Sequence, residues 1–182
     1  MRITYDIDGV IIPLIETICR KHGIDFNKIT EYSISKCDRL TKKEKSLIYR
    51  EFTNVEIFRA AGVYDGALDI NEIAQRNDVF IDSNNVVQDI AFYKAELINR
   101  IIPSVKDIKL SVSTSGKDFK ETDIVVEDCV ANLLDNIQVY RVGILITRPW
   151  NTSVNERDHS KIIRVNSLVE ANSIIKSITY KE

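Results

Sequence analysis

Short β-branched runs alternate with amphipathic stretches along most of this sequence. Runs rich in Val and Ile predict six strands, at residues 2–5, 79–82, 108–112, 124–126, 139–146 and 162–165. Apolar residues three and four positions apart predict the intervening helices, at residues 67–75, 89–102, 131–136 and 168–178. Because strands that alternate with helices pair in parallel, we expect an α/β fold with a mostly parallel sheet that is covered on both faces.

The interval from residue 13 to residue 64 departs from this alternation. Its segments are helix-like and rich in Lys and Glu, without a convincing strand. The chain has only 6 Gly and 3 Pro, and no stretch resembles a flexible linker. We therefore expect residues 1–12 and 65–182 to form one core domain, and residues 13–64 to form a small helical cap inserted after the first strand.

Charge and composition exclude several classes of protein. The 25 Lys and Arg residues nearly balance 27 Asp and Glu residues and are mixed with them, so a nucleic acid polymer is not an expected partner. No apolar run approaches the roughly 18 residues of a membrane span, and residues 1–8 are strand-like rather than signal-like. Cys19, Cys37 and Cys129 form no CxxC pair, which argues against a thiolate zinc site. We expect a cytoplasmic protein with reduced cysteines and no membrane contact.

Polar residues follow the predicted strands where their carboxyl ends should meet. Asp6-Ile7-Asp8-Gly9 follows the first strand, and Ser83-Asn84 ends the second. A Ser-Thr-Ser-Gly stretch and Lys117 follow the third strand, and Glu127-Asp128 ends the fourth. Together they would supply carboxylates for a hard divalent cation, a hydroxyl, and a lysine for an anion. Phosphate is the anion that best fits this set.

Each of these elements alone has an ordinary structural explanation. Ser83 could cap a helix, Lys117 could be a solvated surface lysine, and Glu127-Asp128 could open a helix as an acidic first turn. Their occurrence in order at four successive strand ends favours a shared functional site instead.

These motifs resemble those of the haloacid dehalogenase-like (HAD) phosphohydrolases. Asp6-Ile7-Asp8-Gly9-Val10 resembles the first motif, Ser83 the second, Lys117 the third and Glu127-Asp128 the fourth. The order of segments and the late stretch 146–151 are most similar to the 5'(3')-deoxyribonucleotidases. The resemblance covers nearly the whole chain. It implies a HAD-like Rossmannoid three-layer fold with a mostly parallel central sheet and a small helical cap.

The resemblance also implies a reaction. The chain would be a Mg²⁺-dependent phosphatase that hydrolyses (deoxy)ribonucleoside monophosphates through an aspartyl-phosphate. Asp6 would be the nucleophile, and Asp8 the general acid and base. The metal would be held by the Asp6 carboxylate, the Asp8 backbone carbonyl and Asp128. Lys117 would bind the phosphate and orient Asp6.

Other residues are expected to bind the rest of the substrate. Ser83 and Asn84 would contact the phosphate, and Trp150 would lie at the same edge of the sheet. The predicted cap contains six further aromatic residues: Phe26, Tyr32, Tyr49, Phe52, Phe58 and Tyr64. Because a small cap needs a core of its own, we expect at most about two of these six to contact substrate.

Two departures from the family pattern leave alternatives open. Asp82 precedes Ser83, where an inward-facing acid would be unfavourable for phosphate. Glu127 replaces the first Asp of the fourth motif, where it can act through water or from behind the ligands. The chain could therefore be a HAD phosphatase for another small ester, such as a sugar phosphate, or an inactive HAD-fold binding protein. The intact Asp6, Asp8, Lys117 and Asp128 weigh against inactivity. A homodimer is compatible with the resemblance, but no residue pattern requires one.

Overall fold

The computed structural model describes residues 1–84, 87–111, 117–153 and 159–180. Its strands are β1 (Arg2–Tyr5), β2 (Asp78–Asn84), β3 (Asp107–Ser111), β4 (Ile124–Glu127), β5 (Val142–Ile146) and β6 (Ile162–Val165). Its α-helices are α1 (Leu14–His22), α2 (Lys42–Glu51), α3 (Val55–Ala61), α4 (Ile70–Ala74), α5 (Gln88–Ile101), α6 (Val130–Asp135) and α7 (Leu168–Thr179). Short 3₁₀ helices are η1 (Phe26–Lys28), η2 (Ile34–Lys36) and η3 (Pro149–Asn151).

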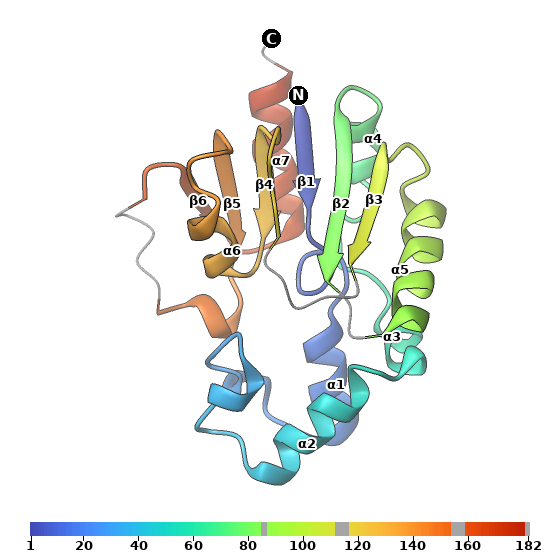
Figure 1. The fold of residues 1–182 in the computed structure, drawn as a ribbon, viewed down its shortest axis with the longest axis vertical. Helices are drawn as coiled ribbons and strands as arrows, with labels where there is room; N and C mark the ends of the chain where they lie inside the picture. Colours follow the sequence, from blue (N-terminus) through green and yellow to red (C-terminus); the bar gives the residue numbers. More distant parts are fainter. Residues whose placement is uncertain (85–86, 112–116, 154–158, 181–182) are drawn as a thin grey trace.

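The strands of the described chain form one parallel sheet in the order β3-β2-β1-β4-β5-β6 (Figure 1). β1 is central: Ile3 pairs with Val79 of β2 on one side and with Ile124 of β4 on the other. Nearly all side chains of β1 and β4 are buried, as expected for strands covered on both faces. The carboxyl ends of β1, β2 and β4 therefore meet at one edge of the sheet.

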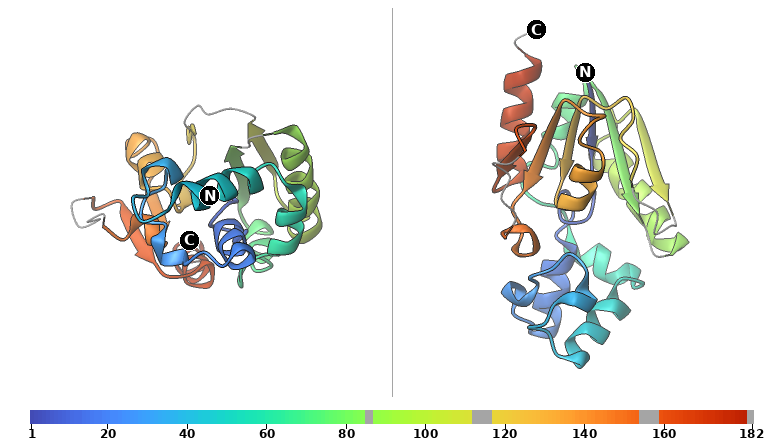
Figure 2. Two further views of the ribbon diagram at one scale, coloured as in Figure 1. Left: turned by 90° about the horizontal axis from the view of Figure 1, so that it is seen from below. Right: turned by 60° about the vertical axis from the view of Figure 1, so that its left-hand side comes forward.

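Helices cover both faces of this sheet. α4 and α7 pack against each other, with α4 on β2 and α7 on β5 and β6, whereas α6 packs on β4 from the opposite face (Figure 2). The buried Tyr5 hydroxyl of β1 donates to Asn172 Oδ1 of α7 (3.1 Å), and Asn172 Nδ2 donates to the Gly66 carbonyl oxygen (2.8 Å). The predicted α/β fold, with three layers and a parallel central sheet, is confirmed.

Two predicted elements are shorter in the structure. The strand predicted over 139–146 begins only at Val142, because the residues before it form hydrogen-bonded turns. The helix predicted over 67–75 is reduced to Ile70–Ala74, because the chain first turns at Gly66, whose φ is +91°. The order of elements is as predicted, so these differences change boundaries and not the topology.

Residues 13–64, which we call the cap segment, contain helices and no strand. They lie beyond the carboxyl ends of the strands, below the sheet in Figure 1. The two ends of the segment are held together, since the Tyr64 amide donates to the Ile11 carbonyl oxygen (2.8 Å). Helix α2 opens with a capping box between Thr41 and Glu44. This geometry fits an insertion after β1, while the division into separate core and cap domains remains a prediction.

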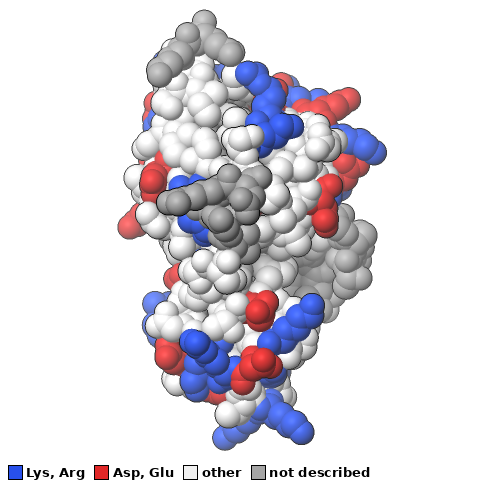
Figure 3. All heavy atoms as spheres, turned by 90° about the vertical axis from the view of Figure 1, so that its left-hand side faces the viewer, with Lys and Arg blue, Asp and Glu red and all other residues white. Residues whose placement is uncertain are grey.

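Charged side chains of both signs are interspersed over the face of the molecule that Figure 3 shows. The described residues on that face form no broad cationic area of the kind that binds nucleic acid. Among the described residues, no helix combines the length and the apolar character needed to cross a membrane.

A buried carboxylate, Glu51, connects α1, α2 and the start of α3. Its oxygens accept hydrogen bonds from Lys21 Nζ (2.9 Å) and Asn54 Nδ2 (2.7 Å), and Oε1 lies 2.8 Å from His22 Nε2. Burial alone would raise the pKa of Glu51, but its bonds to Lys21, His22 and Asn54 hold the pKa at about 2. The ionised carboxylate therefore stabilises the cap segment.

We expect Glu51→Gln to lower the free energy of unfolding by about 2 kcal/mol near pH 6, because it removes the charge that Lys21 faces. A carboxyl group whose pKa is lowered by folding stabilises the protein fully above its unfolded pKa, here 4.5, and loses this effect as the pH falls toward about 2. Urea unfolding of both proteins should therefore show a difference that shrinks as the pH falls below 4.5.

Glu56→Gln is the matched control for this experiment. It removes an exposed ion pair with Arg59 on α3, which should contribute less than about 0.5 kcal/mol at any pH. A destabilisation by Glu51→Gln that does not change with pH would contradict the role given to the Glu51 carboxylate.

Candidate active site

A tight loop after β1 holds two carboxylates at the edge where the strands end. The Asp6 amide continues the ladder by donating to β4 (3.0 Å). The Ile7 carbonyl oxygen then accepts from the amides of Ile11 (2.8 Å) and Ile12 (2.9 Å), which folds the chain back on itself. This compact loop holds Asp6 and Asp8 at the carboxyl end of the central strand.

Gly9 lets this loop approach β4 closely. Its φ is +77°, a conformation that glycine adopts without strain. A Cβ atom at this position would lie only 1.8 Å from Asp128 Oδ2 and 3.3 Å from the Trp150 ring. The Asp128 carboxylate therefore packs directly against the backbone of the loop, and no larger residue fits at position 9.

Lys117 lies between two carboxylates. Its Nζ is 2.6 Å from Asp6 Oδ1 and 2.7 Å from Glu127 Oε1, and its side chain is only 3% exposed. Burial alone would lower the pKa of Lys117, but Asp6 and Glu127 raise it above its ordinary value. Lys117 is therefore a buried cation that contacts Asp6, the predicted nucleophile. Residues 112–116, which include the predicted strand end and the Ser-Thr-Ser-Gly stretch, lie outside the described residues.

Both oxygens of the Glu127 carboxylate accept hydrogen bonds, from Lys117 and from the turn after β4. Besides Lys117, Oε1 accepts from Asn132 Nδ2 (3.0 Å), and Oε2 accepts from the backbone amides of Asp128 and Cys129 (both 3.2 Å). Burial raises the pKa of Glu127, and Lys117 opposes this effect. With its oxygens occupied in this way, Glu127 orients Lys117 from behind the site.

One oxygen of the Asp128 carboxylate, Oδ1, is buried. Among the described residues, nothing hydrogen-bonds to its Oδ1. Its backbone carbonyl oxygen, in contrast, accepts from Trp150 Nε1 (3.3 Å) and Asn151 Nδ2 (2.9 Å). Burial, followed by the neighbouring Asp6 and Glu127 charges, raises the pKa of Asp128 well above its usual range. Such a carboxylate requires a further positive charge to be ionised.

The geometry fits a divalent cation. One oxygen each from Asp6, Glu127 and Asp128 lies within 4.8 Å of the others. Glu127 accepts hydrogen bonds from N–H donors, whereas Asp128 Oδ1 has no hydrogen-bond partner within the described part of the chain. Asp6 and Asp128 are therefore the carboxylates available for coordination. Hard oxygen donors of this kind suit Mg²⁺.

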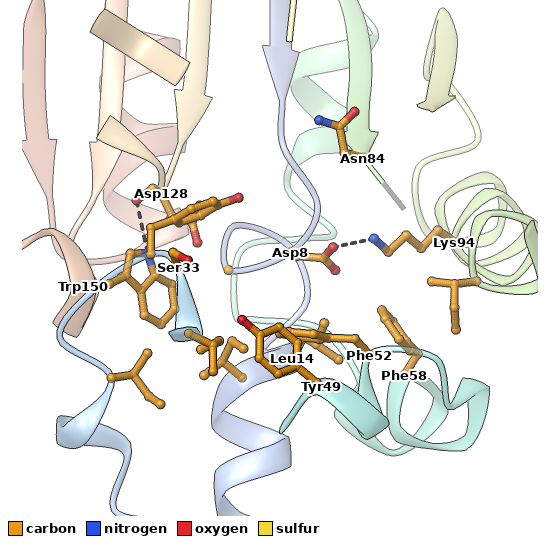
Figure 4. A pocket seen from close by; sticks show the side chains of 16 residues that line it. Asp8, Leu14, Ser33, Tyr49, Phe52, Phe58, Asn84, Lys94, Asp128 and Trp150 are labelled. Atoms are coloured by element: carbon orange, nitrogen blue, oxygen red, sulfur yellow. Dashed lines mark hydrogen bonds and ion pairs between the residues drawn. The ribbon is translucent and has the colours of Figure 1, made fainter. Parts of the chain in front are cut away.

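A second buried lysine, Lys94 of α5, contacts the other carboxylate of the loop. Its Nζ donates to Asp8 Oδ2 and to Ser83 Oγ (3.1 Å), and Figure 4 shows it reaching Asp8 from α5. Asp8 Oδ1 has no hydrogen-bond partner among the described residues. Burial raises the pKa of Asp8, and Lys94 opposes this rise.

Lys94 was not among the predicted site residues, although the sequence contains a signal for it. In α5 the buried positions are Ile90, Lys94, Leu97 and Ile98. A lysine in the apolar face of a predicted helix must find a buried anion or leave the core. The apolar face of α5 therefore indicates that Lys94 is paired, but the sequence does not indicate that Asp8 is its partner.

A cavity of about 570 Å³ lies between this edge of the sheet and the cap segment (Figure 4). Asp8, Asn84, Lys94, Asp128 and Trp150 line it from the sheet side. The lining from the cap segment is mainly apolar: Leu14, Ile15, Ile29, Ile34, Tyr32, Tyr49, Phe52 and Phe58, together with Ser33. The cavity is thus charged at one end and largely apolar at the other.

Most of the cap aromatics line this cavity. Four of the six line it, whereas Phe26 packs edge-on against Trp150 (5.9 Å between ring centroids) and the Tyr64 hydroxyl donates to Glu16 (2.7 Å). Aliphatic residues such as Ile18 and Ile48 are buried in the segment. An aromatic residue that lines the cavity need not contact substrate, so the expected number of substrate contacts stays a prediction.

The remaining predicted residues occupy different environments. Trp150 lines the cavity and also holds the Asp128 backbone, so it has a structural role as well. Asn84 lies at the end of β2 and lines the cavity (Figure 4), while Ser83 is buried beside Lys94. Asp82 is buried too, with Oδ2 3.6 Å from Lys109 Nζ of β3, which partly offsets its charge.

Comparison with known proteins identifies the fold. No family model matches this chain, and no match was found among curated proteins. A haloacid dehalogenase-like family hydrolase from Streptococcus pneumoniae matches with a TM-score of 0.56 and 14% identity, over 95% of this chain and 97% of its own. YfnB of Bacillus subtilis, described as a HAD-hydrolase bound to magnesium, matches with a TM-score of 0.57 and 14% identity, over 96% and 98%.

A third structure, described as a predicted phosphoglycolate phosphatase from Haemophilus somnus, matches with a TM-score of 0.56 and 11% identity, over 94% of this chain and 96% of its own. At these identities the likeness concerns the fold. The chain has the HAD-like α/β fold, as its motifs predicted.

Proposed function

We propose that this protein is a Mg²⁺-dependent phosphomonoester hydrolase that acts through an aspartyl-phosphate on Asp6. One observation carries the proposal: Asp6 is tied to Lys117 beside Asp128, whose buried Oδ1 has no partner among the described residues. A cation and a phosphate dianion would together complete the charge balance of such a site. The HAD-like fold and the motif order support the same chemistry.

Asp6 would act as the nucleophile. Its Oδ1 is held by Lys117 Nζ and by the Ile7 amide (2.7 Å), which leaves Oδ2 for attack on phosphorus. A Mg²⁺ ion held by the Asp6 and Asp128 carboxylates and the Asp8 backbone carbonyl would supply the charge that lets a carboxylate approach a phosphate dianion. Lys117 would stabilise the negative charge on the transferring group.

Asp8 would move the proton. Its side chain lines the cavity and is 31% exposed, so it would protonate the leaving oxygen and then activate the hydrolytic water. Ser83 and Asn84 would bind a phosphate oxygen at the end of β2. Asp6 and Asp8 would thus divide attack and proton transfer between them.

The shape of the cavity supports a nucleotide substrate. A (deoxy)ribonucleoside monophosphate would place its phosphate by Asp6 and its flat base among Tyr49, Phe52 and Phe58. Base stacking on aromatic side chains contributes about 1–3 kcal/mol per base. The motif resemblance to 5'(3')-deoxyribonucleotidases favours the same class of substrate.

A substrate panel tests this proposal directly. We expect Mg²⁺-dependent release of phosphate, with kcat/KM at least about tenfold higher for nucleoside monophosphates than for hexose phosphates or phosphoglycolate, as one stacked base would give. A preference for a sugar phosphate would identify another kind of HAD phosphatase. No turnover of any ester would indicate a binding protein.

Asp6→Asn should lower turnover by several orders of magnitude while the protein remains folded. The change keeps the size of the side chain but removes the nucleophile and a metal ligand. Steady-state rates with circular dichroism as the folding check measure this. Retention of more than about a tenth of the activity, a barrier change below ~1.4 kcal/mol, would refute the covalent mechanism.

Asp8→Asn and Asp128→Asn should have different effects on Mg²⁺. Asp8→Asn keeps the backbone carbonyl, so Mg²⁺ affinity should change less than about threefold while turnover collapses. Asp128→Asn removes an anionic ligand, so the affinity should fall at least about tenfold. Calorimetric titration of Mg²⁺ into both variants compares them, and an equal loss of affinity would show that Asp8 has been given the wrong role.

A further inference from the structure

Lys94 is a buried cation that the reaction described above does not use. Its side chain is 1% exposed, and its Nζ contacts Asp8 Oδ2 and Ser83 Oγ. Burying an ammonium group costs several kcal/mol unless charged and polar partners compensate it. An apolar residue would fill this position on α5 at lower cost. The presence of a lysine here is therefore best explained by its contacts with Asp8 and Ser83.

The contact holds one oxygen of Asp8, and the other oxygen is buried. Asp8 Oδ2 is paired with Lys94, whereas Oδ1 has no hydrogen-bond partner among the described residues. Asp8 and Lys94 both line the cavity, and the Asp8 side chain is 31% exposed. The ion pair with Lys94 thus fixes one orientation of the Asp8 carboxylate beside the cavity.

The position of Lys94 is itself fixed from the cap segment. Its Nζ lies 5.4 Å from the centroid of the Phe58 ring of α3, a cation–π contact. The neighbouring Tyr93 packs its ring against Phe58 (6.4 Å) and donates to the Phe58 carbonyl oxygen (3.3 Å). Helices α3 and α5 therefore hold the ammonium group in place over Asp8.

We propose that Lys94 is a positioning residue that orients the Asp8 carboxylate for proton transfer at the leaving-group oxygen. This inference rests on the proposed phosphatase function. Lys117 is engaged by Asp6 and Glu127, so the two buried lysines serve different carboxylates: Lys117 orients the nucleophile, and Lys94 orients the proton donor. Because Lys94 acts through Asp8, its loss should slow the release of a leaving group that needs the Asp8 proton. The release of a leaving group that needs no proton should change little.

The test compares Lys94→Met with the wild type on two esters. On a nucleoside monophosphate, whose alkoxide leaving group needs a proton, kcat should fall at least about tenfold with KM unchanged within about twofold. On 4-nitrophenyl phosphate, whose leaving group needs none, the single-turnover rate of 4-nitrophenolate release should change less than about threefold, because this release precedes the hydrolysis step that also uses Asp8. An equal fall on both esters, or a loss confined to KM, would overturn the proposal in favour of a phosphate-binding lysine.

A double-mutant cycle adds a second criterion. In the Asp8→Asn background, Lys94→Met should change single-turnover rates on the nucleotide less than about twofold, because the group it positions is already gone. A full multiplicative effect would overturn the proposal. Lys176→Met, which removes an ion pair with Glu72 outside the cavity (2.6 Å), is the matched control and should leave both rates unchanged.

A crystal structure of Lys94→Met separates this inference from the proposed function. If the wild type hydrolyses no ester, the phosphatase proposal fails, but the structure still reports on Lys94. A changed orientation of the Asp8 carboxylate would support positioning by Lys94, and an unchanged orientation would overturn it.

Discussion

The ammonium group of Lys117, buried between Asp6 and Glu127, is the interaction on which the rest of the site depends. β1 and β4 are neighbours in the sheet, so the carboxylates that follow Tyr5 and Val126 must lie close together in a region with little water. Without a cation between them, their repulsion would be large in such an environment. The sheet order thus dictates the need for Lys117, and Lys117 in turn fixes which oxygen of Asp6 is free to react.

The remaining charges explain why a metal is expected at this edge. Lys117 pairs with Asp6 and Glu127, and Lys94 pairs with Asp8, whereas the Asp128 carboxylate forms no close ion pair among the described residues. Gly9 permits Asp128 to lie against the loop backbone, where a hard cation could also reach Asp6. The apolar, aromatic end of the cavity lies beyond. A ligand with an anionic head and a flat body would match both ends.

Much of this arrangement could be predicted from the sequence because parallel strands place their carboxyl ends together. β1 and β6 have the predicted bounds, and the motif residues Asp6, Lys117 and Asp128 do meet in one cluster. The partners of Lys94 could not be predicted, since the packing of α5 against the loop after β1 depends on tertiary geometry. That four of the cap aromatics line the cavity could not be predicted either. Periodicity shows which face of a helix is apolar, but not whether that face meets a core or a cavity.

The most direct test of the account is a crystal structure of the protein grown with Mg²⁺ and beryllium trifluoride, which mimics an acyl phosphate on a carboxylate. A covalent mechanism on Asp6 predicts the trifluoride bonded to Asp6 Oδ2 and contacted by Lys117, with the metal ion between Asp6 and Asp128. Trifluoride bound elsewhere, or a metal held without Asp128, would contradict it.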